Sequence, residues 1–371
     1  MRRRMRIQFP LLALGLLALL AGMWGGLLRL GWSWPILAAP LPMAHGPLMV
    51  SGFLGTLISL ERAVALGRRW AYTAPLLAGA GALLLVGGVV PWLGPLLMTL
   101  GSALLVGIFA AILRRQMALF TATMTLGALA WLVGNLLWLA GWPVFRVVSW
   151  WLGFLVITIA GERLELSRMR QLARRHHLAF ASAVGLLLGG LALSLFTYDG
   201  GMHLSGAGLA ALALWLGRYD LARRTVRMAG LTRFIAVALL AGYVWLGIGG
   251  VLALILGGVT AGPFYDAMLH TVFVGFVISM VFAHAPIIFP ALVQVPVPFQ
   301  RRFYAHVALL HLSLIARVGG DLAGIFVLRR LGGLMGAAAI LLFLASTLRA
   351  ARTATTTRPV TQLPGKVREQ L

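Results

Sequence analysis

The sequence contains no cysteine, and this absence removes several kinds of site at once. Without thiols the chain has no disulfide, no thiolate metal site, no iron–sulfur cluster and no covalently attached c-type haem. A metal would have to be bound by histidine, methionine or carboxylate side chains, or within a noncovalently bound macrocycle.

Charged residues are also scarce, at 11% of the 371 residues, and only 8 residues are acidic. Hydrophobic residues make up 61% of the chain, and the mean hydropathy is +0.95. A water-soluble fold cannot bury so much apolar surface. Apolar stretches of about 20 residues, the length that crosses a hydrocarbon core, follow one another along the chain. Because they are continuous and not short and alternating, we expect an all-α integral membrane protein.

The apolar stretches predict about twelve transmembrane helices in a single domain over residues 1–352. We interpret the first stretch as a span because no convincing signal-peptide cleavage site follows it. The polar tail over 353–371 is predicted to be disordered and cytoplasmic. The expected spans are 8–31, 37–62, 71–92, 94–114, 118–141, 144–166, 178–198, 203–223, 231–257, 263–290, 303–325 and 332–350.

The net charge of +23 would suggest nucleic acid in a soluble protein. Here 26 of the 31 lysines and arginines fall at the termini or near the loops that follow even-numbered spans, in pairs such as Arg68-Arg69 and Arg301-Arg302. Positive charge stays on the cytoplasmic side of a membrane. We therefore predict a multi-pass protein of a bacterial-type inner membrane with both termini cytoplasmic, a lipid bilayer around it and no nucleic-acid partner.

Three segments align without a gap: Gly52–Arg62, Gly153–Arg163 and Gly275–Ala285. Each begins with Gly-Phe and has an ionisable residue nine positions after the glycine. These ionisable residues are Glu61, Glu162 and His284. The segments fall in spans two, six and ten, which predicts three four-helix units of one orientation, about 8–117, 118–230 and 231–352. The alternative is a chance recurrence of Gly-Phe in a glycine-rich protein.

Two of the eight histidines, His45 and His270, lie in the first turns of spans two and ten, near the outer face. Two neutral imidazoles at one depth on equivalent helices could bind one haem iron from opposite sides. The alternative is that each ring bonds to a backbone carbonyl in a helix bend. For this pair we favour iron ligation.

A second group of ionisable residues is expected near the inner face. Its histidines are His284, His306 and His311, and its acids are Glu61 and Glu162. Imidazole and carboxylate groups at this depth predict a second metal site or a proton site. The alternative is that the two Glu-Arg pairs only anchor helix ends at the interface.

Arg329 and Arg330 lie near the loop between spans eleven and twelve, on the predicted outer side where cations are rare. Adjacent arginines there predict an anionic partner, and haem propionates would be suitable. The alternatives are a misplaced span boundary and anchoring to lipid phosphate.

Together these features resemble the catalytic subunit of haem–copper oxidases and nitric oxide reductases, in which twelve spans form three four-helix arcs. The sequence around the two histidines, over Met43–Met49 and Leu269–Gly275, resembles the NnrS-like membrane proteins more closely. These proteins are described as containing haem and copper and are linked to nitric oxide metabolism. The resemblance implies a low-spin haem held by His45 and His270, with Arg329 and Arg330 on its propionates.

The chain departs from the oxidases at the copper site. The oxidases have a histidine followed by a tyrosine in span six, where this chain has Ser149–Phe154 with neither. Span seven has no histidine after His177, and the outer half of span ten has only His270. These differences argue against a dioxygen-reducing centre at the usual place and against conventional proton pumping.

The leading hypothesis is a membrane protein with noncovalent haem b, and copper as a further metal, in nitric oxide or respiratory electron transfer. It would exchange electrons with quinol or a periplasmic carrier and, if catalytic, would be a haem-dependent oxidoreductase. One alternative is a proton-coupled transporter that uses Glu61, Glu162 and Asp266. Another is a noncatalytic metal-delivery or assembly protein that uses Met43, His45 and Met49.

Overall fold

The protein is represented by a computed structural model that describes residues 2–88 and 90–356. Regular structure in these residues is entirely helical. The first six long helices are α1 (Arg2–Arg29), α3 (Gly55–Leu66), α4 (Thr73–Gly87), α5 (Leu93–Arg115), α6 (Leu119–Leu139) and α7 (Val144–Leu166). The others are α8 (Arg174–Leu193), α9 (Tyr198–Tyr219), α11 (Gly230–Leu256), α13 (Ser279–Val293), α14 (Phe303–Ala323) and α15 (Phe326–Thr356). Short elements are α2 (Leu41–Pro47), η1 (Leu48–Leu54), η2 (Arg69–Tyr72), η3 (Ser167–Arg170), α10 (Ala222–Thr225), α12 (Gly262–His270) and η4 (Thr271–Ile278).

Within the described residues, eleven helical segments are long and apolar enough to cross a membrane. The chain is therefore a multi-pass membrane protein in a lipid environment. The eighth expected span, 203–223, forms helix α9, which packs against α8 and α11 but is not among the eleven. Asp199, His203 and Arg218 lie on α9 and lower its hydropathy.

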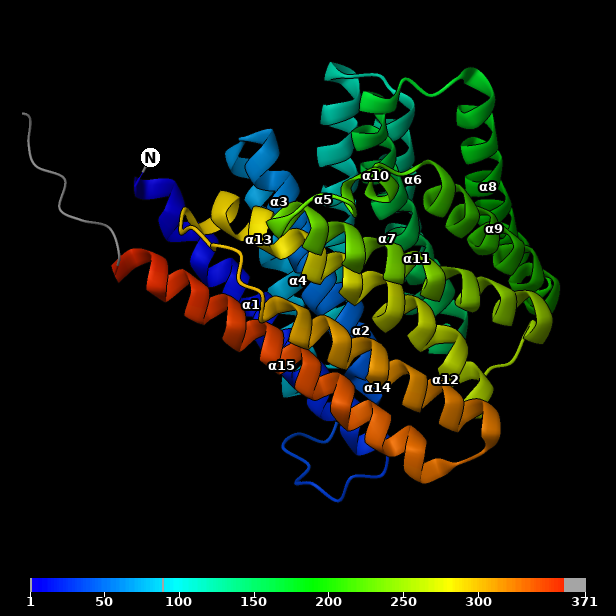
Figure 1. The fold of residues 1–371 in the computed structure, drawn as a ribbon. Helices are drawn as coiled ribbons and strands as arrows, with labels where there is room; N and C mark the ends of the chain where they lie inside the picture. The colour runs from blue at the N-terminus through cyan, green and yellow to red at the C-terminus, as the bar shows by residue number, and fades with distance from the viewer. Residues whose placement is uncertain (1, 89, 357–371) are drawn as a thin grey trace, which may run out of the picture.

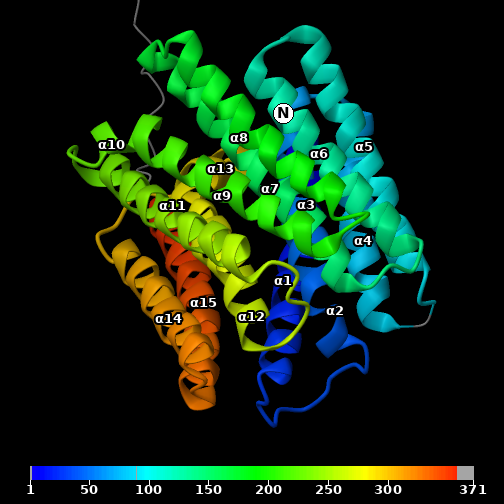
Figure 2. The ribbon, with the colours of Figure 1, turned by 90° about the vertical axis from the view of Figure 1, so that its right-hand side faces the viewer.

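Helix α7 lies at the centre of the bundle. In its apolar stretch 83% of the residues are buried, against 33–61% in the other ten candidate spans. Figures 1 and 2 show it surrounded by the other helices. Phe154 on α7 stacks on Trp131 of α6, with ring centroids 4.9 Å apart.

A buried amide ties four helical segments together. Asn135 of α6 is fully buried, and its Oδ1 accepts hydrogen bonds from Trp151 Nε1 at 2.9 Å and Ser51 Oγ at 3.2 Å. Its Nδ2 donates to the carbonyl oxygen of Met98 on α5 at 3.2 Å. Because a bilayer offers no water to such groups, these bonds restrict how α5, α6, α7 and η1 pack.

Spans two and ten share a local irregularity. Each contains a π-helix, η1 in span two and η4 in span ten, and each π-helix holds the Gly-Phe pair of its repeat copy. Pro47, directly before η1, has no N–H to continue the α-helical ladder. The second copy, in α7, is α-helical throughout. Single π-turns are frequent at functional sites.

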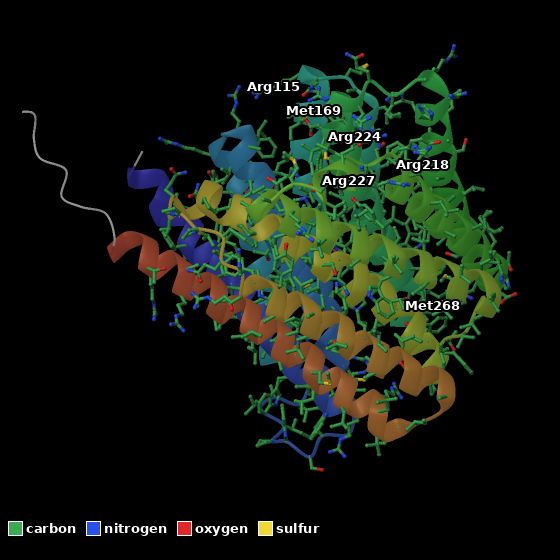
Figure 3. The ribbon with its side chains drawn as sticks, in the orientation of Figure 1. Arg115, Met169, Arg218, Arg224, Arg227 and Met268 are labelled. Atoms are coloured by element: carbon green, nitrogen blue, oxygen red, sulfur yellow. The ribbon has the colours of Figure 1, made fainter. Side chains whose placement is uncertain are left out.

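The two ends of the described chain lie at one end of the bundle, which we call the terminal end (Figure 1). Arg115, Arg218, Arg224 and Arg227 lie in one region of the bundle, away from Met268 of α12 (Figure 3). The side of the membrane that the terminal end faces stays a prediction, as does the arrangement of the helices in three arcs. Of the predicted tail, residues 353–356 continue α15 and the rest lies outside the described residues.

Glycines allow close helix contacts, which predicts opposite effects for two substitutions on α9. A Cβ on Gly206 would lie 2.3 Å from the backbone nitrogen of Leu254 on α11, whereas a Cβ on Gly217 has nothing within 4 Å. Gly206→Ala should therefore lower the free energy of unfolding by about 1–3 kcal/mol. Gly217→Ala should leave it unchanged or raise it by up to about 1 kcal/mol through helix propensity. Unfolding of both variants in one detergent would check this, and equal stabilities would contradict the α9–α11 contact.

Candidate functional site

His45 and His270 face each other across the end of the bundle opposite the terminal end. Their ring centroids are 6.3 Å apart, and the ring planes are inclined by only 13°. The two residues are 225 positions apart in the sequence, at the ends of span two and span ten that begin with α2 and α12. The fold thus brings together the two histidines that the sequence predicted as a pair.

Each ring is oriented in the same way. Nδ1 of His45 lies 2.7 Å from the carbonyl oxygen of Gly22, and Nδ1 of His270 lies 2.9 Å from that of Asp266. Since a carbonyl only accepts, Nδ1 is the donor in both rings and Nε2 carries the lone pair. Nε2 of neither ring makes a hydrogen bond within the described residues. A hydrogen bond from the second ring nitrogen to a carbonyl is the usual support for a metal-binding histidine.

Helix α1 makes room for the first histidine with a row of glycines. A Cβ on Gly26 would lie 2.7 Å from Cε1 and Nδ1 of His45, and a Cβ on Gly25 would lie 2.3 Å from the carbonyl oxygen of Leu41. The carbonyl oxygen that orients His45 belongs to Gly22, one turn earlier. The small residues of α1 therefore set both the position and the tautomer of this ring.

The two rings line a cavity of about 1000 Å³, including its open mouth. Its walls are almost entirely apolar, with Arg317 and Ser313 as the other polar side chains. The wall formed by α15 consists of small residues and one isoleucine: Gly332, Gly333, Gly336, Ala337 and Ile340. The arrangement offers two imidazole nitrogens to a metal and a smooth apolar space to a flat ring system.

A buried charge cluster lies beside the cavity. Arg317 of α14 binds Asp266 with two hydrogen bonds, from Nε at 2.7 Å and from Nη2 at 2.9 Å. Arg329 Nη2 lies 3.5 Å from Asp266, and its Nε lies 2.9 Å from Asp321. Asp266 also lies 3.3 Å from Nδ1 of His270, so the acid connects the arginines to the second histidine.

The predicted Arg329-Arg330 pair is divided between two roles. Arg329 is held by the two aspartates, whereas the guanidinium of Arg330 lies 4.1 Å from the ring centroid of Trp32. Arg330 has no acidic partner among the described residues, and its buried Nε has no hydrogen bond. Neither arginine lines the cavity, whereas Arg317 does.

At the terminal end the repeat also brings its ionisable residues together. Arg62 binds Glu162, and its Nη2 donates to Glu61 Oε1 at 3.1 Å. Glu61, Glu162 and His284, the equivalent residues of the three copies, line one cavity of about 660 Å³. Of the residues expected together near the inner face, Glu61, Glu162 and His284 line this cavity, and His306 and His311 do not.

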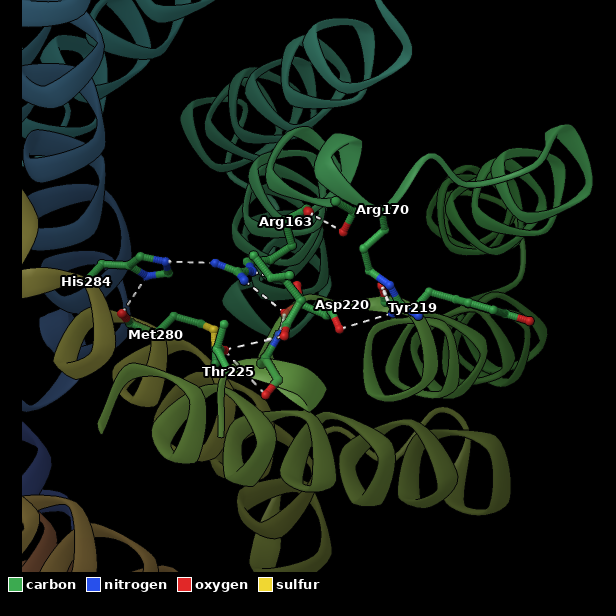
Figure 4. A network of polar contacts seen from close by, with 10 residues as sticks. Arg163, Arg170, Tyr219, Asp220, Thr225, Met280 and His284 are labelled. Carbon is green, nitrogen blue, oxygen red and sulfur yellow. Dashed lines mark hydrogen bonds and ion pairs between the residues drawn. The ribbon is translucent and has the colours of Figure 1, made fainter. Parts of the chain in front are cut away.

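His284 also belongs to a network with the second repeat copy (Figure 4). Its Nδ1 donates to the carbonyl oxygen of Met280 at 2.8 Å, and its Nε2 lies 3.4 Å from Arg163 Nη1. Arg163 binds Asp220 through Nε at 2.8 Å and Nη2 at 2.9 Å. Asp220 is fully buried and neutralises this arginine.

The predicted second metal site is not formed by the described residues. His306 lies among aromatic rings, with Phe282 at a centroid distance of 4.8 Å, and His311 Nδ1 accepts a hydrogen bond from Trp245 at 3.0 Å. Among the described residues, no group of three or more His, Cys, Asp or Glu side chains could hold a metal ion. His306 packs against Phe282 of α13 with neither ring nitrogen hydrogen-bonded, whereas His311 faces Trp245 of α11, so the two imidazoles do not share a site.

Sequence reasoning missed Arg317 and the glycines of α1 and α15. Arg317 was visible as an isolated cation inside an apolar stretch, a position that normally requires an acidic partner. Asp266 had been considered only as an acid for proton coupling. The glycines gave no signal by themselves, because the chain has 45 of them.

Comparison with known families gives one match over nearly the whole chain. Residues 6–352 match the family described as "Domain of unknown function (DUF8744)", and the chain belongs to this family. No curated protein matches the sequence. The resemblance to the NnrS-like proteins and haem–copper oxidases therefore stands on the sequence motifs alone.

The charge cluster predicts a large cost for removing its central acid. Asp266→Asn leaves the buried guanidinium of Arg317 without its ionic partner, which should cost about 3–5 kcal/mol of folding stability. Asp199→Asn is the matched control, because Asp199 is 71% exposed and faces only His203 as an ionic partner, at 3.5 Å. It should change the stability by less than about 1 kcal/mol. Thermal unfolding in detergent measures both, and a harmless Asp266→Asn would show that the pair contributes nothing.

Proposed function

We propose that this protein binds haem noncovalently between His45 and His270 and acts as a redox membrane protein in nitric oxide or respiratory electron transfer. The observation that carries the proposal is the paired geometry of the two rings, 6.3 Å apart and nearly parallel, with both Nδ1 atoms committed to carbonyls. It leaves both Nε2 lone pairs for a metal.

The separation of the rings suits one shared iron. An imidazole nitrogen binds a first-row metal at about 2 Å and lies about 1 Å from its own ring centroid, so two rings across one metal have centroids about 6 Å apart. Stacked rings without a metal would pack closer together, because nothing would separate them. The protein's part is to hold the rings at this spacing before the metal arrives.

The cavity supports a macrocycle in preference to a bare ion. Its walls offer two imidazoles but no further histidine and no carboxylate, so a bare ion would have only the thioethers of Met23 and Met49 as additional ligands. The α15 wall of small residues leaves space for a flat ring, and Arg317 is the arginine in the lining that would face an anionic substituent. Haem supplies reversible one-electron chemistry when bound. Covalent c-type attachment is excluded because the chain has no cysteine, and we propose noncovalently bound haem b as the occupant.

The arginine-rich terminal end would face the cytoplasm of a bacterial-type inner membrane, which places the histidine pair near the outer face. Electrons would then be exchanged with quinol in the bilayer or with a periplasmic carrier. The transporter alternative loses Asp266, which binds Arg317, whereas Glu61 and Glu162 share the single guanidinium of Arg62.

The first prediction from this proposal concerns the absorption spectrum. The protein should show a Soret band when it is expressed in cells supplied with haem and purified from their membranes. The double variant His45→Ala/His270→Ala should have at least about tenfold less haem. His203→Ala, which changes a half-exposed histidine on α9, should keep the full band. A wild-type protein without a Soret band, or a double variant that retains it, would refute the proposal.

A second prediction concerns a substitution that fills the cavity and leaves both histidines in place. Gly46 lines the cavity, and a Cβ there would have no heavy atom within 4 Å. Gly46→Leu should lower haem content by at least about tenfold while folding stability changes by less than about 1 kcal/mol, because its side chain enters empty space. Gly319→Leu on α14 is the control, since its Cβ is equally free but does not line the cavity. Equal haem content in the two variants would place the macrocycle elsewhere.

A further inference from the structure

The cavity at the terminal end lies between α3, α7 and α13 and has a volume of about 660 Å³, including its open mouth. It is close to the histidine cavity, because Leu54 lines both. Ile278 lines the histidine cavity and its neighbour Val277 lines the terminal one. About one layer of side chains therefore separates the two spaces.

The polar end of this cavity has an excess of negative charge. Glu61 and Glu162 share a single guanidinium, that of Arg62. The neighbouring Arg163 does not compensate, because Asp220 binds it through two hydrogen bonds. His284 donates a hydrogen bond from Nδ1 to the carbonyl oxygen of Met280 and contributes no negative charge. One carboxylate is thus left without a counter-charge at membrane depth, which favours an occupant with hydrogen-bond donors and disfavours an anion.

The free atoms of the two carboxylates are available to such an occupant. Both use Oε1 on Arg62, and within the described residues Oε2 of either makes no hydrogen bond. The side chains of Glu61 and Glu162 remain 27% and 24% exposed. The rest of the wall is apolar, with Ile288, Phe289 and Leu292 from α13 at one side.

We propose that this cavity binds the headgroup of a quinol, whose two hydroxyls donate to Oε2 of Glu61 and Oε2 of Glu162. A quinol is lipid-soluble, has donors on an apolar ring, and carries an apolar tail that matches the α13 wall. The proposal rests on the haem function above, because a quinol in this position would be the electron source for iron bound in the adjoining cavity.

The test measures binding and does not depend on haem. The full chain in detergent is titrated anaerobically with decylubiquinol and with its dimethyl ether, in which both donors are blocked. Wild-type protein should bind the quinol at least about tenfold more tightly than the ether, the value of one charge-assisted hydrogen bond. Glu61→Leu should lose this preference. Glu165→Leu is the matched control on α7, since Glu165 faces the half-exposed Arg168, and it should keep the preference.

Glu61→Gln serves if Glu61→Leu does not fold, because it keeps the shape while removing the charge and should weaken quinol binding in the same direction. Equal binding of quinol and ether would overturn the inference, as would an unchanged preference in both Glu61 variants. Tighter binding of decylamine than of the quinol would overturn it too, in favour of a cationic occupant. The haem proposal fails separately, through the Soret band, so the two failures can be told apart.

Discussion

The constraint on which the structure depends is that a polar group inside the bilayer must find its partner within the protein. Most of the buried charges here obey it in pairs, such as Arg317 with Asp266 and Arg163 with Asp220. The buried amide of Asn135 does so as an uncharged group. The groups that keep a free lone pair are therefore informative. Among the described residues they include Nε2 of the two histidines in one cavity and Oε2 of the two glutamates in the other, beside isolated buried atoms such as the two ring nitrogens of His306. Free acceptors at this depth are costly unless a ligand uses them, and this reasoning underlies both proposals.

Close packing turns this constraint into defined geometry. Where helices approach through glycine, their positions are set by backbone contact and not by adjustable side chains. Gly26 brings α1 within contact distance of the His45 ring, and Gly332 brings the backbone of α15 against Arg317 of α14. Both contacts border the histidine cavity. A site built this way is rigid before it binds, which lowers the entropic cost of binding a flat ligand.

Much of this could be predicted from the sequence, for physical reasons that also explain the errors. Continuous apolar stretches determine where helices cross, so eleven of the twelve expected spans are present. Helix α9 is not among them because polar residues such as Asp199, His203 and Arg218 lower its hydropathy. The pairing of His45 with His270 followed from their equivalent depth. The partners of Arg329 did not follow, because a pair of adjacent arginines gives no information about which acids lie across the helix interface. The second metal site was wrong for a similar reason: similar depth on two helices does not mean that side chains share a face, and His306 turns toward Phe282.

The three Gly-Phe segments differ at the position where two of them are preceded by a histidine. His45 precedes its repeat glycine by seven residues and His270 by five, yet the two ring centroids lie 6.3 Å apart, and both spans contain a π-helix at the Gly-Phe pair. The second copy has no π-helix, and Val148, five residues before Gly153, lines the same cavity with an apolar side chain. A metal with two opposed ligands needs an unobstructed plane between them, and a third imidazole would enter that plane. Loss of the histidine from the central copy is therefore consistent with a flat occupant. At the terminal end all three segments have an ionisable residue. Hydrogen bonding to a small headgroup there does not require an unobstructed plane between the side chains.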